Sequence, residues 1–216
     1  MEEVNPLEYQ IRHIPIKRLF DILFSFLCLL VGSPIFLLIA ICIYFTSPGR
    51  IIYAHPRVGR GGKTFHCYKF RTMYPDAAQR LNDLLMRDPA LKEEWEKTYK
   101  LKQDPRVTPL GKFLRKTSLD ELPQFWNVLK GDLSVVGPRP VVQEEIDKYL
   151  GAKAYKILSI RPGLTGLWQV SGRSDVTCYT TRIQLDEAYV DNHSLLLDVK
   201  LVAKTVPAML FSKGAY

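Results

Sequence analysis

The strongest hydrophobic pattern in the chain is a single apolar run near its N-terminus. Residues 22–45 include no charged side chain, and a helix of about 20 apolar residues is long enough to cross a bilayer. The run is too long, and lies too far from the start, for a simple cleaved signal peptide, and no small-residue cleavage site follows it. It therefore predicts a membrane helix.

Two features of this run favour a re-entrant hairpin over a single span. Ser33 and Pro34 lie near its middle, where proline removes a hydrogen bond and kinks or breaks a helix, and Ser33 can satisfy freed backbone groups. Both flanks are basic, which places both ends on the cytoplasmic side by the positive-inside rule. The flanking residues are Arg12, Lys17 and Arg18 before the run and Arg50, Arg57, Arg60 and Lys63 after it. Since proline is also frequent in spanning helices, the residues alone leave hairpin and span equally open.

The rest of the chain has the mixed periodicities of one α-rich α/β domain. Runs at 50–54 and 64–70, joined by a glycine turn at 59–62, predict two strands. Apolar spacing and breakers predict a strand at 133–136 and helices at 76–101 (divided by Pro89), 109–116, 120–130, 141–150, 152–160, 177–192 and 194–211. The last helix either packs in the core, which we favour, or lies at a membrane surface.

Composition narrows the class of protein. Charged residues make up 24% of the 216 residues, too many for a polytopic membrane protein, and the net charge of +8 favours an anionic partner such as phospholipid, nucleotide or nucleic acid. The four cysteines form no C-x-x-C pair, so we expect neither a disulfide framework nor a zinc site. A reducing, cytoplasmic setting fits the polar part of the chain.

The segment around residue 120 holds the side chains best suited to catalysis. Asp120 and Glu121 follow the basic pair Arg115 and Lys116. Because Pro123 lacks an N–H, it fits the third position of a helix that Asp120 caps. The helix dipole and Arg115 would keep Asp120 ionised, as a nucleophile requires, and two carboxylates also suit Mg²⁺. A helix cap alone accounts for most Asp-Glu pairs of this kind.

Other residues suit the binding of an anion or a nucleotide. Arg139 lies in a turn stiffened by two prolines, where a fixed guanidinium matches a phosphate, although a structural pair with Asp132 or Glu144 is equally compatible with the sequence. Lys69 lies near the end of a predicted strand. It could bind the same anion or be an ordinary surface charge. The glycine-rich loop at 161–173 has the turns to hold a nucleotide base and phosphate, a weak signal by itself.

Several long segments occur in a fixed order that resembles one family. They are residues 17–21 (KRLFD), 33–34 (SP), 68–73 (YKFRTM), 117–124 (TSLDELPQ), 131–140 (GDLSVVGPRP) and 161–173 (RPGLTGLWQVSGR). Together they resemble the catalytic unit of the bacterial sugar transferases, also called monotopic phosphoglycosyl transferases or polyprenyl-phosphate sugar-1-phosphate transferases. The resemblance extends from Lys17 to the C-terminus.

The resemblance implies a fold and a location. An N-terminal segment, 1–16, would precede a re-entrant membrane hairpin, 17–48, broken at Ser33 and Pro34. A small cytoplasmic catalytic domain, 49–216, with short strands and interfacial helices, would follow at the bacterial inner membrane. Many relatives with the same loop at 161–173 carry a multi-helix region before this unit, so we expect either a short form or a fragment.

The resemblance also implies roles for residues and partners. Asp120 would attack the β-phosphorus of a UDP-sugar, release UMP and pass the sugar phosphate to undecaprenyl phosphate, with Glu121 helping. Asp120 and Glu121 would hold Mg²⁺. Phosphate-binding residues would be Arg115, Arg139 and Lys69, and nucleotide-binding residues Gln169, Arg173 and Arg161.

The implied partners are the UDP-sugar, the polyprenyl carrier and membrane phospholipid. No nucleic-acid partner is implied, and a homo-oligomer is one possible state of the protein. The loop at 161–173 hints at a hexose such as glucose or galactose and at exopolysaccharide, capsule or O-antigen synthesis. The alternative function is a non-enzymatic, membrane-anchored basic module that binds anionic lipid or nucleic acid.

Overall fold

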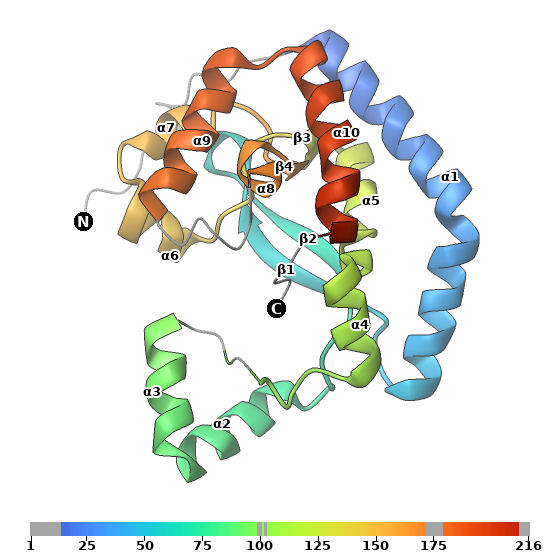
Figure 1. The fold of residues 1–216 in the computed structure, drawn as a ribbon, viewed down its shortest axis with the longest axis vertical. Coiled ribbons are helices and arrows are strands. Elements are labelled where there is room, and N and C mark those ends of the chain that lie inside the picture. Colours follow the sequence, from blue (N-terminus) through green and yellow to red (C-terminus); the bar gives the residue numbers. More distant parts are fainter. Residues whose placement is uncertain (1–13, 99–100, 102, 172–178, 212–216) are drawn as a thin grey trace.

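The computed structural model describes residues 14–98, 101, 103–171 and 179–211, and it combines many helices with two small sheets (Figure 1). The helices are α1 (Pro15–Thr46), α2 (Ala77–Arg87), α3 (Pro89–Thr98), α4 (Pro109–Thr117), α5 (Gln124–Lys130), α6 (Gln143–Glu145), α7 (Lys153–Ile157), α8 (Leu167–Val170), α9 (Tyr179–Asn192) and α10 (Leu195–Phe211). Short 3-10 turns are η2 (Arg60–Gly62) and η3 (Leu119–Glu121), and η4 (Ile146–Leu150) is π-helical. The prediction of an α-rich α/β domain is confirmed.

The two sheets are each made of two strands. Strands β1 (Ile52–Val58) and β2 (Thr64–Phe70) form an antiparallel hairpin in which Ile52 faces Phe70. The predicted strand at 50–54 therefore begins later and runs four residues further than expected. Strands β3 (Ser134–Val136) and β4 (Gly163–Thr165) pair in parallel. The sequence analysis placed residues 163–165 in a loop, so β4 is a correction.

Close contact between glycines holds β3 and β4 together. A Cβ atom on Gly163 would lie 2.0 Å from the backbone nitrogen of Gly137, a distance that no side chain tolerates. The backbones approach this closely because neither residue has a side chain. Two glycine-rich segments far apart in the sequence, the turn at 137–140 and the loop at 161–166, thus lie side by side.

Helix α1 continues through the expected break. Pro34 lies inside one helix of 32 residues, so the structure lacks the two separate arms that the predicted hairpin requires. Because Pro34 has no N–H, the carbonyl of Leu30 loses its helical donor, and the Ser33 hydroxyl donates to that carbonyl instead at 2.8 Å. The helix keeps its course and curves along the outside of the domain (Figure 1).

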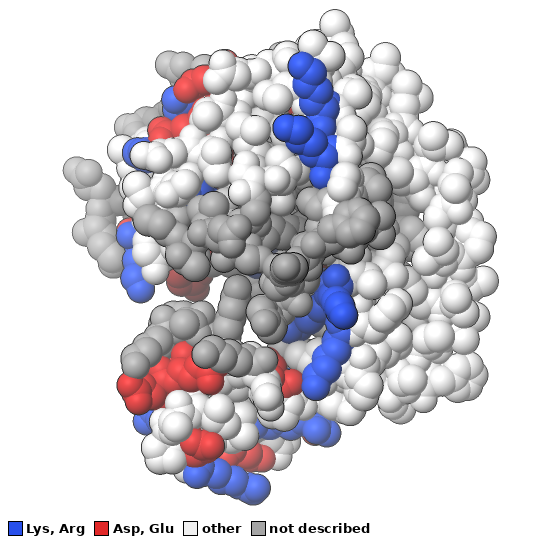
Figure 2. Space-filling view, viewed as in Figure 1, with Lys and Arg blue, Asp and Glu red and all other residues white. Residues whose placement is uncertain are grey.

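Both ends of α1 bury side chains against the domain, whereas most large apolar side chains in its middle are exposed. Lys17, Asp21 and Ser25 are buried at its N-terminal end, and Ile39 and Ile43 at its C-terminal end. Between them, large apolar side chains are about half exposed or more: Phe26, Leu27, Leu30, Val31, Ile35, Leu37 and Leu38. Among the described residues, α1 is the helix long and apolar enough to cross a membrane. Figure 2 shows an uncharged surface on the side where α1 runs.

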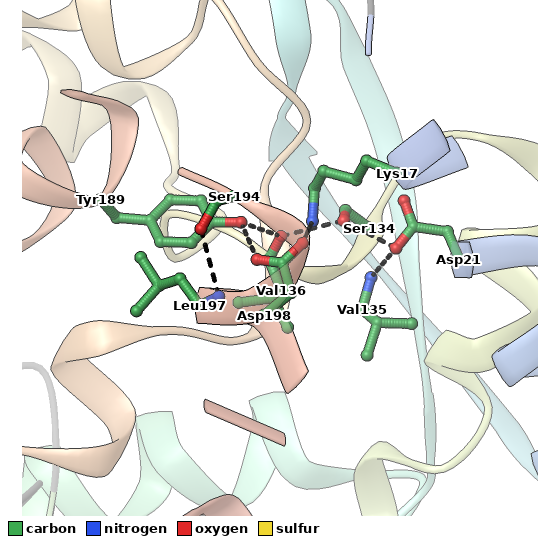
Figure 3. Close-up of polar contacts among 9 residues, drawn as sticks. All are labelled: Lys17, Asp21, Ser134, Val135, Val136, Tyr189, Ser194, Leu197 and Asp198. Atoms are coloured by element: carbon green, nitrogen blue, oxygen red, sulfur yellow. Dashed lines mark hydrogen bonds and ion pairs between the residues drawn. The ribbon is translucent and has the colours of Figure 1, made fainter. Parts of the chain in front are cut away.

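A buried polar network anchors the N-terminal end of α1 (Figure 3). The Lys17 ammonium lies 2.6 Å from a carboxylate oxygen of Asp198 on α10. The other oxygen of Asp198 accepts a hydrogen bond from the Tyr189 hydroxyl at 2.6 Å. One turn further along α1, Asp21 accepts hydrogen bonds from the hydroxyl of Ser134 and the N–H of Val135, each at 2.9 Å. One network therefore connects α1 with β3, α9 and α10.

An apolar cluster anchors the other end of α1. Ile39 and Ile43 pack with Phe70 of β2 and Leu114 of α4, all four at most 7% exposed. A second cluster lies around β3, α9 and α10 and includes Leu133, Val136, Tyr189 and Val190. Helix α10 contributes Leu201 to it, as expected for a last helix that packs in the core, whereas Leu196 and Val199 of the same helix are exposed.

We expect Asp198→Asn to lower the free energy of unfolding by about 3–5 kcal/mol, because it leaves the Lys17 ammonium buried without its charged partner. Thermal unfolding in detergent, followed by circular dichroism, measures the loss. The matched control is Asp191→Asn, which removes an exposed pair with Lys156 and should cost less than about 1 kcal/mol. Equal losses in the two variants would contradict the anchoring role of the buried pair.

Candidate active site

Asp120 lies in a tight turn between two helices rather than at a helix cap. Helix α4 ends at Ser118, which has the left-handed backbone conformation (φ 57°). The 3-10 turn η3 follows and contains Asp120, and α5 begins only after Pro123, without a side-chain cap. The prediction that Asp120 caps a helix at 120–130 is therefore wrong. Because Ser118 adopts the left-handed conformation, the chain turns before Asp120 is reached. The Asp120 carboxylate therefore does not cap α5.

Strand β2 brings a lysine to this turn. The Lys69 ammonium lies 2.7 Å from a carboxylate oxygen of Glu121, and both side chains are about one third exposed. Asn127 of α5 fixes the strand in place: its side-chain amide donates to the carbonyl of His66 at 2.7 Å and its carbonyl accepts from the N–H of Tyr68 at 2.9 Å. The sequence analysis missed Asn127, since a polar residue in a helical segment carries no signal that it is buried.

Helix α4 brings Arg115 to the same place. A Cβ on Gly111 would lie 2.0 Å from the carbonyl oxygen of Thr72, so α4 crosses directly on the chain that follows β2. The Arg115 guanidinium donates to the Thr72 hydroxyl at 2.9 Å. Burial lowers the pKa of Arg115, whereas the nearby charges of Asp120 and Asp104 raise it. Arg115 and Asp120 are therefore within electrostatic reach of each other.

Burial dominates the electrostatics of Asp120. Asp120 is 7% exposed. This burial is the main cause that raises the pKa of Asp120 to about 6. The charge of Glu121 raises this pKa further, whereas Lys69 and Arg115 lower it. We expected the helix dipole and Arg115 to decide the state of this group, and burial outweighs them. Asp120 is then mainly ionised at pH 7 and becomes protonated in mild acid.

Arg139 is within electrostatic reach of Glu121 in the turn. Its guanidinium lies 5.1 Å from the ring centre of Trp168, and that of Arg182 lies 5.6 Å from the same ring. Burial and the charge of Arg182 lower the pKa of Arg139, and the charge of Glu121 raises it. No ion pair joins Arg139 to Asp132 or Glu144 within the described part of the chain; Asp132 pairs with Lys130 at 3.1 Å instead. Arg139 thus lies over the ring of Trp168, within electrostatic reach of Glu121.

Helix α9 supports this arginine with residues that the sequence analysis did not single out. Asp186 accepts a hydrogen bond from the backbone N–H of Arg139, and burial raises the pKa of Asp186 to about 7. Arg182 pairs with Glu145 at 3.3 Å, and the Tyr179 hydroxyl donates to the same carboxylate at 2.7 Å. These side chains occupy ordinary polar positions of a helical pattern, so only the fold shows that they lie beside residue 139.

The predicted nucleotide-binding residues lie in different places. Gln169 is 4% exposed, next to Trp168, and its side-chain oxygen has no hydrogen-bond partner among the described residues. Arg161 donates to the carbonyl of Gly131 at 2.7 Å and lies with Arg18 near the start of α1, apart from the carboxylate turn. Arg173 lies outside the described residues.

The two carboxylates of the turn are candidate ligands of a metal ion that also binds phosphate. Among the described residues no group of three or more His, Cys, Asp or Glu side chains could hold a metal. Mg²⁺ needs only one or two carboxylates when substrate phosphates and water supply the other oxygens. Asp120 and Glu121 therefore suit a magnesium ion that arrives with a phosphorylated substrate.

Comparisons with known proteins point to one family. A family model described as bacterial sugar transferase matches residues 12–212. The chain is 50% identical to the exopolysaccharide production protein ExoY of Sinorhizobium fredii, over 93% of this chain and 88% of that protein. It is also 50% identical to an undecaprenyl-phosphate galactose phosphotransferase of Salmonella typhimurium, over 93% of this chain and 42% of that protein.

A third relative carries another sugar in its name. The UDP-glucose:undecaprenyl-phosphate glucose-1-phosphate transferase of Klebsiella pneumoniae is 39% identical, over 93% of this chain and 41% of that protein. The family model and relatives of this similarity identify an enzyme, a phosphoglycosyl transferase, rather than a non-enzymatic lipid-binding or nucleic-acid-binding module. The chain belongs to the bacterial sugar transferase family.

Proposed function

We propose that the protein transfers a hexose 1-phosphate from a UDP-sugar to undecaprenyl phosphate and releases UMP. The observation that carries the proposal is the setting of Asp120. It is a buried carboxylate with a raised pKa, and Lys69, Arg115 and Glu121 surround it. Such a group suits nucleophilic attack on phosphorus, since it is ionised near neutral pH and only weakly solvated.

The first step forms a covalent intermediate. A carboxylate oxygen of Asp120 attacks the β-phosphorus of the UDP-sugar, the bond from that phosphorus to the oxygen of UMP breaks, and UMP leaves with the electron pair. Arg115, Lys69 and Arg139 bind the phosphate oxygens and offset the charge that develops on the leaving group. The sugar phosphate is then held on Asp120 as an acyl phosphate.

The second step regenerates the enzyme. A phosphate oxygen of undecaprenyl phosphate attacks the same phosphorus, the bond to Asp120 breaks, and the carboxylate reforms. The product is a polyprenyl diphosphate sugar. Because UMP departs before the lipid reacts, the two substrates use one site in turn, which gives ping-pong kinetics.

Magnesium and the nucleotide have candidate ligands in the described structure. Asp120 and Glu121 would hold Mg²⁺, which when bound neutralises charge on the diphosphate and the leaving UMP. Gln169 has a buried oxygen with no partner among the described residues, and it lies beside the arginine-flanked ring of Trp168, so we assign the nucleotide to this side. Arg161 already binds the carbonyl of Gly131, and we leave it out of the site.

The attachments of α1 support membrane entry from one side. A spanning helix separates its ends by about 30 Å of hydrocarbon. Here the N-terminal end contacts Asp198 and Ser134, the C-terminal end contacts Phe70 and Leu114, and all four belong to the same domain. A domain attached to both ends lies alongside the helix. We therefore propose that α1 enters one leaflet at the cytoplasmic face of the inner membrane, with its exposed apolar middle in lipid.

The names of the relatives suggest the sugar and the pathway. The Salmonella typhimurium relative is named for galactose and the Klebsiella pneumoniae relative for glucose, so we propose one of these hexoses. The name of the Sinorhizobium fredii relative suggests exopolysaccharide synthesis.

We expect Asp120→Asn to abolish UMP release, with a loss of at least about 10³-fold, because an amide cannot attack phosphorus. The assay supplies UDP-galactose or UDP-glucose with undecaprenyl phosphate and Mg²⁺ and measures UMP. Asp83→Asn on the exposed face of α2 is the control and should keep full activity. Wild-type activity in Asp120→Asn would remove this residue from the nucleophile role.

We expect the rate constant for adduct formation, measured as kcat/KM for the UDP-sugar, to fall on the acid side of pH 6. The pKa of Asp120 is raised to about 6, so lower pH protonates the nucleophile and the rate falls about tenfold per pH unit. Lys69→Met removes a charge that favours the ionised form and should shift this acid limb to higher pH. Glu121→Gln removes a charge that favours the protonated form and should shift it to lower pH. A shift in the reverse sense for either variant would contradict this account.

We expect single cysteines at both ends of α1 to be inaccessible from outside. Ile16→Cys and Arg50→Cys are introduced after the four native cysteines are replaced. In intact spheroplasts a membrane-impermeant maleimide should label neither, and after permeabilisation it should label both. Labelling of one of the two in intact spheroplasts would instead show a spanning helix.

A further inference from the structure

A cavity of about 170 Å³ lies between α1 and the turn that contains Asp120. Its walls are apolar and come from five parts of the chain. It is lined by Phe24 of α1, Leu122 just before α5, Phe125 of α5, Val135 of β3, Leu164 of β4 and Val202 of α10. Its wall therefore joins the lipid-exposed helix to the candidate active site.

Four polar side chains take part in the lining of this cavity. Thr165 and Thr205 are two of them, but their hydroxyls bond to each other at 2.7 Å, and that of Thr205 also bonds to the carbonyl of Leu201 at 2.7 Å. The other two are Ser118 and Glu121, which flank Asp120 in the chain. Apart from the bonded pair of threonines, the lining is thus apolar except where it meets the catalytic turn.

We infer that this cavity holds the isoprenoid chain of the acceptor lipid next to its phosphate. This inference rests on the proposed function. The acceptor is a phosphate joined to a hydrocarbon chain, so the carbon atoms nearest the phosphate must lie close to Asp120 when the phosphate attacks. An apolar cavity that meets the turn at Glu121 offers that arrangement, with the phosphate at the turn and the hydrocarbon between Phe24 and Val202.

The size and position of the cavity suit this ligand. A cavity of about 150 Å³ lined by apolar side chains takes up benzene, so this one accommodates a branched five-carbon isoprene unit. The remainder of the chain can follow α1, whose side chains Phe26, Leu27 and Leu30 are 57–60% exposed and would already contact lipid. The site thereby selects a hydrocarbon carrier over a water-soluble phosphate.

The test variant is Val202→Trp, which fills the cavity. Its control is Val199→Trp, the same change on the exposed face of α10, where Val199 is 49% exposed. The acceptors are undecaprenyl phosphate and the short, soluble farnesyl phosphate. We expect Val202→Trp to lower kcat/KM for both acceptors at least tenfold and Val199→Trp to change it less than twofold. Unchanged acceptor kinetics in Val202→Trp would overturn the inference.

The first half-reaction separates this inference from the proposed function. UMP released in a single turnover with UDP-sugar and no acceptor should be the same in Val202→Trp as in the wild type. If Val202→Trp loses this step too, the cavity does not serve the acceptor and the inference fails. If the wild type releases no UMP from either UDP-sugar, with or without acceptor, the proposed transfer itself fails.

A milder substitution keeps the inference testable if tryptophan prevents folding. Val202→Cys and its control Val199→Cys are alkylated with and without farnesyl phosphate, and the modified peptides are quantified by mass spectrometry. We expect farnesyl phosphate to slow alkylation at position 202 at least fivefold and to leave position 199 unchanged. Equal protection at both positions, or none at 202, would overturn the inference.

Discussion

The constraint on which the candidate site depends is the burial of a carboxylate, Asp120, which we propose as the nucleophile. Asp120 is 7% exposed, and removal from water penalises its ionised form. Lys69 and Arg115 offset part of that penalty, whereas the neighbouring Glu121 adds to it. The result is a pKa of about 6, which leaves the group ionised near neutral pH but poorly solvated. Elements from four parts of the chain are arranged around this balance.

The need to place charged side chains around the buried Asp120 explains the close packing at positions outside the turn. Arg115 reaches Asp120 only because α4 crosses the chain at Thr72 with Gly111 in contact. Lys69 reaches Glu121 because Asn127 holds β2 against α5. Arg139 is held within electrostatic reach of Glu121 because Gly137 and Gly163 let β3 and β4 approach closely, and because Asp186 binds its backbone N–H. In each case a buried contact positions the charged side chain. The contacts of Gly111, Asn127 and Gly137 involve uncharged groups, and Asp186 binds the backbone of Arg139 rather than its guanidinium.

The sequence predicted the segments of this site better than their geometry. The strand at 64–70 and the helix at 109–116 were placed within one residue, because hydrophobic period, glycine and proline determine them locally. The apolar run at 22–45 is helical, but its helix begins at Pro15 and continues through the predicted break at Pro34. Asp120 as a helix cap was wrong, since the left-handed conformation of Ser118 has no local signature in a serine. Strand β4 escaped notice because a strand of three residues, which begins at Gly163 and ends before Gly166, shows no period. Asn127, Arg182 and Asp186 matter through partners far away in the sequence, which no local pattern reveals.

The double attachment of α1 gives the membrane helix a role in the architecture of the site. Asp21 of α1 binds the backbone of β3 at Val135, and β3 leads directly into the turn that carries Arg139. Phe24, one turn further along, lies 6.3 Å from Phe125 of α5, measured between ring centres. A helix that merely tethered the domain would need neither contact. Because α1 forms part of the wall beside Glu121, the depth at which it lies in lipid also sets the height of Asp120 above the hydrocarbon. A carrier lipid keeps its phosphate at the headgroup level, so under the proposed mechanism α1 would hold Asp120 and the acceptor phosphate at the same plane.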